Sequence, residues 1–141
     1  MINSKLNPQN QYICLVGLNN LYNISEFKVH GNEFSASIGF DPTHEIFSGH
    51  FPGQPVVPGV CLIHIVKEIA NMISEKDVFL TEGSNIKFLK VIAPGENAKL
   101  QIQGTLTPEA AEQIKITAKI FTEDSVFFKF LGRFNNESVN Q

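Results

Sequence analysis

Apolar and polar residues alternate along residues 27–40, which is the period of a β-strand with one buried face. The polar stretch His30-Gly31-Asn32 interrupts this alternation in the middle and has the composition of a tight turn. The apolar positions are Phe27, Val29, Phe34, Ala36, Ile38 and Phe40. This pattern predicts a β-hairpin.

Residues 59–73 have a different period. Polar side chains occur only at His64, Lys67, Glu68 and Asn71, a spacing that places them in one narrow stripe of a helix. Apolar residues cover the rest of the circumference, and Pro58 stands where proline is favoured at a helix start. We therefore expect a central helix that other elements surround.

The C-terminal half predicts those elements. Residues 84–96 contain a strand that ends in the Pro94-Gly95 turn, and alternating segments follow at 97–106, 112–121 and 125–134. Four successive strands with short connections predict an antiparallel meander. The expected fold is α+β, with one long helix held against a curled antiparallel sheet of five to seven strands. We expect a single domain over residues 1–141, with a loose lead-in at 1–10 and a frayed tail at 135–141.

Composition narrows the choice of partners. The net charge of −3 and the single arginine, Arg133, argue against nucleic-acid binding. No apolar run reaches the roughly 18 residues needed to span a bilayer, and no signal peptide is recognisable, so a cytoplasmic location is expected. Cys14 and Cys61 lie in apolar surroundings and are expected to be buried, reduced thiols.

The segment "GHFPGQPVVPG" at residues 49–59 resembles the motif of the hot-dog-fold β-hydroxyacyl-(acyl carrier protein) dehydratases of bacterial fatty acid synthesis. It matches every specified position of Gly-His-Phe-Pro-Gly-x-Pro-x-x-Pro-Gly. Residues 86–96 are similar to the basic strand of that family, and the resemblance extends over about residues 25–133. The N-terminus lacks the Pro-His-Arg segment of the family.

The resemblance implies a base at His50, which would remove the proton next to the thioester. It also implies a carboxylic acid fourteen residues later, but position 64 holds His64. Glu68 lies one turn further on the same helix face, where the family usually has Gln, and an ion pair would favour the imidazolium of His64. We therefore expect His64 and Glu68 to form an altered acid side. The alternative interpretation is that both belong to the solvated stripe of the helix.

Further roles follow from the same resemblance. The backbone N–H groups of Gly59 and Val60 are expected to hold the thioester carbonyl, because the first N–H groups of a helix have no intrahelical partner. Phe51 is expected to contact the acyl substrate. Lys87 and Lys90 are candidates for docking an acidic acyl carrier protein, although ordinary solvent-facing lysines would give the same pattern.

The activity implied is reversible dehydration of a 3-hydroxyacyl thioester, delivered on a phosphopantetheine arm, to the trans-2-enoyl thioester. No cofactor or metal is expected, since the Pro/Gly motif accounts for His50 without placing it among ligands such as His44. The family pairs its sheets, so at least a homodimer with a shared site is expected. Two alternatives remain open, namely a hot-dog acyl thioesterase and a non-catalytic acyl-thioester-binding subunit.

Overall fold

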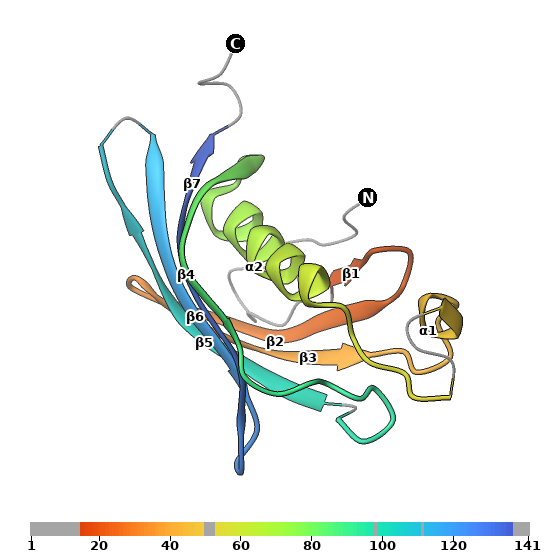
Figure 1. Cartoon of the computed structure of the whole chain (residues 1–141). Helices are drawn as coiled ribbons and strands as arrows, with labels where there is room; N and C mark the ends of the chain where they lie inside the picture. The colour runs from red at the N-terminus through yellow and green to blue at the C-terminus, as the bar shows by residue number, and fades with distance from the viewer. Residues whose placement is uncertain (1–14, 50–52, 98, 111, 137–141) are drawn as a thin grey trace.

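A strongly curved antiparallel sheet wraps around one long helix in the computed structural model (Figure 1). The structure describes residues 15–49, 53–97, 99–110 and 112–136. The elements are β1 (Leu15–Gly17), β2 (Tyr22–His30), β3 (Glu33–Phe40), α1 (Ile46–Gly49), α2 (Gly59–Ser74), β4 (Val78–Phe88), β5 (Lys99–Pro108), β6 (Gln113–Phe121) and β7 (Val126–Asn136). The predicted α+β class, the hairpin and the central helix are confirmed.

The order of the strands in the sheet is β1-β2-β3-β5-β6-β7-β4. Strands β5, β6 and β7 form a meander as predicted, but β4 pairs with β7 at the edge and does not contact β5 as a neighbour. The expectation of a four-strand meander is therefore wrong for β4. The connection from β4 to β5 spans about ten residues, which is long enough to pass from the edge of the sheet to its middle, whereas a hairpin loop has two to five.

Strand β4 also has different bounds from those expected. It begins at Val78 and ends at Phe88, so Lys90 follows the strand. Its register against β7 shifts twice, once between Leu80 and Glu82 and once between Gly83 and Asn85. Each shift leaves one extra residue in β4, which is the definition of a β-bulge. At the other end of the chain, β7 continues to Asn136, two residues into the expected tail, while residues 1–10 lie outside the described part.

The core lies between the inner face of the sheet and α2. Ile65, Val66 and Ile69 of the helix are completely buried, and Ile38 and Phe128 of the sheet are equally so. Full burial of side chains of this size contributes about 1.5–3 kcal/mol each. None of the helices in the described residues is long and apolar enough to cross a membrane.

The polar stripe of α2 is not a solvated face along its whole length. Glu68 and Asn71 are both buried, and Asn71 Oδ1 accepts a hydrogen bond of 2.9 Å from the backbone N–H of Val78. This bond joins the end of the helix to the start of β4. The interpretation of the stripe as a purely solvent-facing surface is therefore wrong for these two residues.

Candidate active site

The start of α2 is the first part of the candidate site. Pro58 precedes the helix in an extended conformation (φ −61°, ψ 141°), and no side chain caps the helix there. The first N–H groups of α2 therefore keep their capacity to donate a hydrogen bond to a ligand, and the helix dipole favours negative charge at this point. Val60 is 70% exposed, so this end of the helix is open to approach. The backbone at Gly59 and Val60 is therefore consistent with the predicted binding of a thioester carbonyl.

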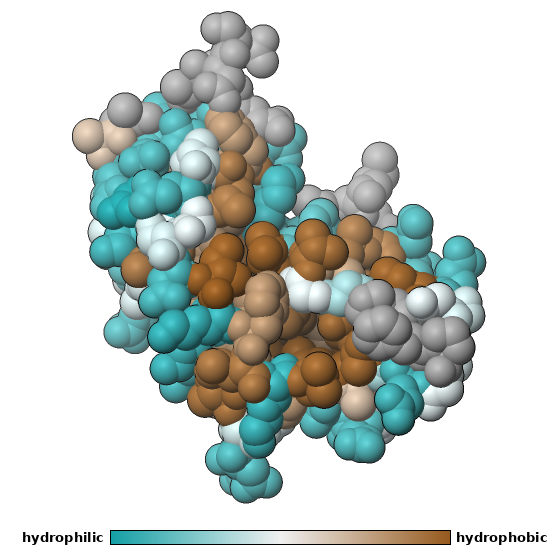
Figure 2. Space-filling view, in the orientation of Figure 1, coloured by the Kyte–Doolittle hydropathy of each residue, from teal (hydrophilic) through white to brown (hydrophobic). Residues whose placement is uncertain are grey.

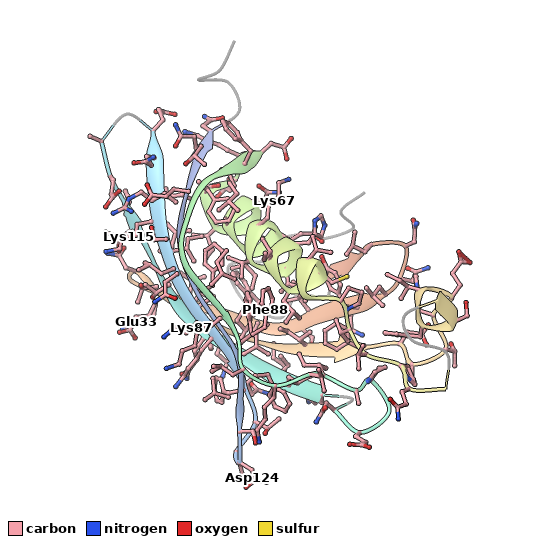
Figure 3. The ribbon with its side chains drawn as sticks, in the orientation of Figure 1. Glu33, Lys67, Lys87, Phe88, Lys115 and Asp124 are labelled. Atoms are coloured by element: carbon pink, nitrogen blue, oxygen red, sulfur yellow. The ribbon has the colours of Figure 1, made fainter. Side chains whose placement is uncertain are left out.

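Gly59 has no room for a side chain on the side of β4. A Cβ atom at this position would lie 2.7 Å from Cε1 of Phe88, whose ring is 54% exposed. Phe88 points from the edge strand toward the helix (Figure 3) and stacks on Phe128 with ring centroids 5.3 Å apart. The open end of α2 is thus bordered by an aromatic ring, which gives an apolar contact beside the free N–H groups.

The second part of the site lies just over one turn further along α2. Nε2 of His64 is 3.4 Å from Oε1 of Glu68, so the helix brings the two residues together as their spacing predicts. The imidazole remains about one-third exposed, whereas Glu68 is 4% exposed. A buried carboxylate needs hydrogen-bond or ionic partners, because burial without them is costly. Within the described residues, the other ring nitrogen of His64, Nδ1, has no hydrogen-bond partner.

Tyr22 of β2 is the second partner of Glu68. Its hydroxyl donates a hydrogen bond to Oε1, the same oxygen that faces His64. The Tyr22 ring also meets the imidazole edge-on, with centroids 6.3 Å apart. Burial, together with the hydrogen bond to Glu68 and the charge of that carboxylate, raises the pKa of Tyr22 far above its usual value. Tyr22 therefore remains a donor over the whole physiological range.

Gly17 of β1 provides the space for this contact. A Cβ atom there would collide with Oε1 of Glu68 and with the Tyr22 hydroxyl. Sequence reasoning identified neither Gly17 nor Tyr22. A signal existed for Tyr22, one of two tyrosines in the chain, because a tyrosine inside an apolar strand needs a hydrogen-bond partner for its hydroxyl.

Other candidates lie apart from this cluster or outside the described residues. His50 and Phe51 fall outside them, so their predicted roles as base and substrate contact stay predictions. His44 is held by backbone groups: Nδ1 accepts from the N–H of Ile46 at 3.0 Å, which leaves Nε2–H to donate to Asn19 O at 3.0 Å. Cys61 is buried, and burial raises the pKa of its thiol, as expected for a structural cysteine.

The two lysine candidates lie in different surroundings. Lys87 is in β4 and projects to the side of the sheet opposite to Phe88 and α2 (Figure 3). Lys90 follows β4, and its Nζ donates a 2.8 Å hydrogen bond to Oγ of Ser125 in the turn before β7. The structure does not bring these lysines together with His64 and Glu68.

Comparison with known proteins adds the family. The model of the ApeI-like family, described as ApeI dehydratase, matches residues 26–130. The chain belongs to this dehydratase family. The ApeI-like match begins within β2 and ends within β7, and it includes the helix with His64 and Glu68, so all the described site residues except Gly17 and Tyr22 fall within it.

Curated relatives of this ApeI-like chain are 3-hydroxyacyl-[acyl-carrier-protein] dehydratases named FabZ. The protein from Rickettsia bellii is 31% identical over an alignment of 102 residues, and the match covers 65% of this chain and 69% of the relative. The protein from Lactobacillus helveticus is 34% identical over an alignment of 89 residues, and the match covers 58% of this chain and 59% of the relative. The family predicted from residues 49–59 is thereby confirmed.

Solved structures share the hot-dog fold of this ApeI-like chain. The dehydratase heterocomplex ApeI:P from Xenorhabdus doucetiae has a TM-score of 0.61 at 21% identity and covers 77% of this chain and 92% of that one. A thioesterase from Pseudomonas aeruginosa has a TM-score of 0.53 at 10% identity and covers 79% and 78%. At these identities the likeness concerns the fold alone.

Proposed function

We propose that this protein is a cytoplasmic 3-hydroxyacyl-(acyl carrier protein) dehydratase that converts a 3-hydroxyacyl thioester reversibly to the trans-2-enoyl thioester. The observation that carries the proposal is the contact of His64 with the buried Glu68–Tyr22 pair, just over one helical turn from the uncapped start of α2. The names of the curated relatives support the substrate class.

The proposed reaction needs a base, a carbonyl clamp and an acid. His50 takes the proton from the carbon next to the thioester, and the N–H groups of Gly59 and Val60 hold the carbonyl oxygen as it gains negative charge. The electron pair forms the new carbon–carbon double bond while the bond to the β-hydroxyl breaks. His64 donates a proton to the departing β-hydroxyl, which leaves as water. No oxidant, reductant or metal takes part in this balance.

Glu68 acts in this scheme as a positioning residue. Its Oε1 lies 3.4 Å from Nε2 of His64, so the other ring nitrogen, Nδ1, is the one left to serve the substrate in this scheme. The Tyr22 hydroxyl holds Glu68 in place from the other side.

The proposal extends to a second subunit, and we take a second copy of this chain as the partner. Strand β4 is an edge of the sheet, and large apolar side chains are exposed on it, on the segment after it and on the first turn of α2 (Figure 2). They are Val60, Leu80, Phe88, Leu89 and Val91. An edge strand flanked by exposed apolar residues favours pairing with another chain. The ApeI:P structure is a heterocomplex, so the partner could also be a different chain. Native mass spectrometry of the purified protein tests this: a dimer mass supports the homodimer, and a monomer mass supports a different partner.

Lys87 and Lys90 remain the proposed docking residues for an acyl carrier protein. Lys90 is two residues after Phe88, the residue whose ring borders the start of α2. This position makes Lys90 a stronger candidate for docking than Lys87, which projects to the other side of the sheet. Charge reversal at Lys90 should weaken carrier-protein binding more than the same change at Lys76, a lysine beyond the far end of α2.

One assay separates the proposal from its alternatives. A 3-hydroxyacyl carrier protein is incubated with the purified chain, and ultraviolet absorbance follows the enoyl product while a thiol reagent follows hydrolysis. We expect enoyl formation by the wild type and by His30→Gln, a matched histidine change on an exposed residue away from the site. We expect loss of at least 100-fold in His50→Ala and in His64→Ala, the usual size of an acid–base contribution. Free thiol without enoyl would favour the thioesterase, and neither product would favour the binding subunit.

A further inference from the structure

The outer face of the sheet, opposite to α2, carries a groove, and Lys87 is the only residue of it to which the proposed activity gives a role. Its volume is about 780 Å³, and it runs across six strands, from β4 at one edge to β2. Neither helix of the described residues covers it, because α2 lies on the inner face and α1 lies beside the end of β3 (Figure 1). Glu33, Lys87 and Lys115 are seen on this outer side (Figure 3).

Two parallel rows of side chains form the groove, and the strand register defines them. The first, which we call the lysine row, contains directly opposed residues of successive strands: Lys87, Lys129, Lys119, Gln103, Ser35 and Lys28. The second, the polar row, contains Asn85, Leu131, Thr117, Thr105, Glu33 and His30 in the same strand order. All twelve residues line the cavity.

The lysine row brings like charges together. Lys87 faces Lys129, and Lys129 faces Lys119, so three ammonium groups stand on three adjacent strands. Like charges directly opposite one another destabilise a sheet. None of the ion pairs between described residues involves these three lysines, whereas Arg133 on the same face is paired with Glu82 and Glu109. Within the described residues the cluster thus has no ion-pair partner, although Glu33 lines the other side of the groove and Lys119 Nζ lies 4.9 Å from the centre of the Phe121 ring.

The groove also has a restricted width. The two rows are two residues apart along each strand, or about 6.8 Å. An α-helix with its side chains is about 10–12 Å wide, so it would rest on the lysines without entering the groove. A flat lipid surface would likewise miss the floor. An extended chain fits the width, and six strands at about 4.8 Å spacing give a length of about 24 Å, which corresponds to about seven extended residues.

The chemistry of the walls matches a peptide. Carboxylates of a bound segment would meet the ammonium groups of Lys87, Lys129 and Lys119. Amide and hydroxyl groups of Gln103, Thr105 and Asn85 can bond its backbone, although Thr105 already shares a 2.7 Å hydrogen bond with Thr117. We propose that this groove binds an extended acidic segment of a partner protein. The site is distinct from the start of α2, and the proposal does not depend on the dehydratase activity.

The test uses an end-labelled peptide of eight glutamates, which extends at neutral pH because its charges repel. Fluorescence anisotropy at low ionic strength measures its binding to the full chain. Lys119→Gln/Lys129→Gln should weaken binding at least tenfold. The matched control is Lys67→Gln/Lys76→Gln, which removes the same charge from α2 and from the segment after it and should change binding less than twofold. Binding should weaken as salt is added, because ions screen exposed charges.

Several outcomes would overturn the proposal. The first is that the peptide does not bind, and the second is that both double variants lose peptide binding equally. The third is that a single-stranded oligonucleotide of the same charge, or vesicles rich in anionic phospholipid, bind as tightly as the peptide. Stability provides a separate check. The midpoint of urea unfolding should be unchanged or higher in Lys119→Gln/Lys129→Gln, because the variant relieves repulsion between opposed lysines. A lower midpoint would show that the lysines serve the fold, and it would contradict a cluster kept for a partner.

Discussion

The hydroxyl of Tyr22 in β2 and the carboxylate of Glu68 in α2 form a buried hydrogen bond between residues 46 positions apart. This bond joins the sheet to the helix at the point where His64 approaches the same carboxylate oxygen. The acid side of the candidate site is therefore built from two elements, and each can be tested separately.

Tyr22→Phe removes the hydroxyl and keeps the ring. We expect a loss of about 1–3 kcal/mol in the free energy of unfolding, since the buried carboxylate loses a donor, and a lower turnover because Glu68 is less firmly held. Urea unfolding and the enoyl assay measure the two effects. Unchanged turnover with reduced stability would restrict Tyr22 to a structural role.

The same residue gives a pH dependence. The pKa of Tyr22 is raised in the folded protein, so the folded state binds the proton more tightly than the unfolded state does. This contribution to stability is complete below a pH of about 10, the ordinary tyrosine pKa, and it is lost as the pH rises above that value. We expect the wild type to lose stability more steeply than Tyr22→Phe above pH 10. Parallel curves would contradict the assignment.

Gly17→Ala would place a methyl group against Glu68 and Tyr22. Crowding of a packed site costs about 1–3 kcal/mol, and we expect a loss of this size in urea unfolding together with reduced turnover. Gly95→Ala is the control, because a Cβ atom there meets nothing within 4 Å. Similar losses in the two variants would show that the effect of Gly17→Ala comes from glycine replacement in general.

Glu68→Gln keeps an acceptor for the Tyr22 hydroxyl but removes the negative charge beside His64. We expect turnover to fall by at least about tenfold with little change in KM, because a neutral amide holds the imidazole of the proposed acid less firmly than the carboxylate does. Steady-state kinetics of the wild type and the variant measure the change in kcat and in KM. If Glu68→Gln turns over at the wild-type rate, the pairing of His64 with Glu68 has no catalytic role.

Gly59→Ala tests the aromatic ring at the open end of α2. The added methyl group would meet Phe88, but that ring is more than half exposed and can move, so we expect a modest stability loss of about 1 kcal/mol. Phe88→Ala in the same chain should remove this loss. A double-mutant cycle by urea unfolding gives the coupling energy, and additive effects would exclude a direct clash.

Much of the fold could be predicted because its buried elements have a clear period. The hairpin of residues 27–40 shows the alternation that burial of one face produces. The helix of residues 59–73 shows the narrow polar stripe that is left when nearly the whole circumference is buried. The first half of β4 could not be predicted. It is an edge strand whose residues Glu82 to Asn85 are exposed, so no apolar alternation marks it.

The site divides in the same way. The i, i+4 spacing of His64 and Glu68 is local and predicts their contact directly. The contacts of Tyr22 and Gly17 with Glu68 depend on how β1 and β2 pack against α2. A pattern of residues close in sequence does not predict this packing. The lysine row was missed for the same reason, because the register of six strands brings its four lysines into line.

The two bulges of β4 have a consequence for how this family can tolerate length changes. Thr81 and Ser84 are the extra residues, and because there are two of them the alternation beyond them is restored. Deleting either one alone would rotate the end of the strand by half a turn, so that Lys87 would face α2 and Phe88 would face outward. Viable insertions and deletions in this strand should therefore occur in pairs, since a single one would damage both surfaces of the protein at once.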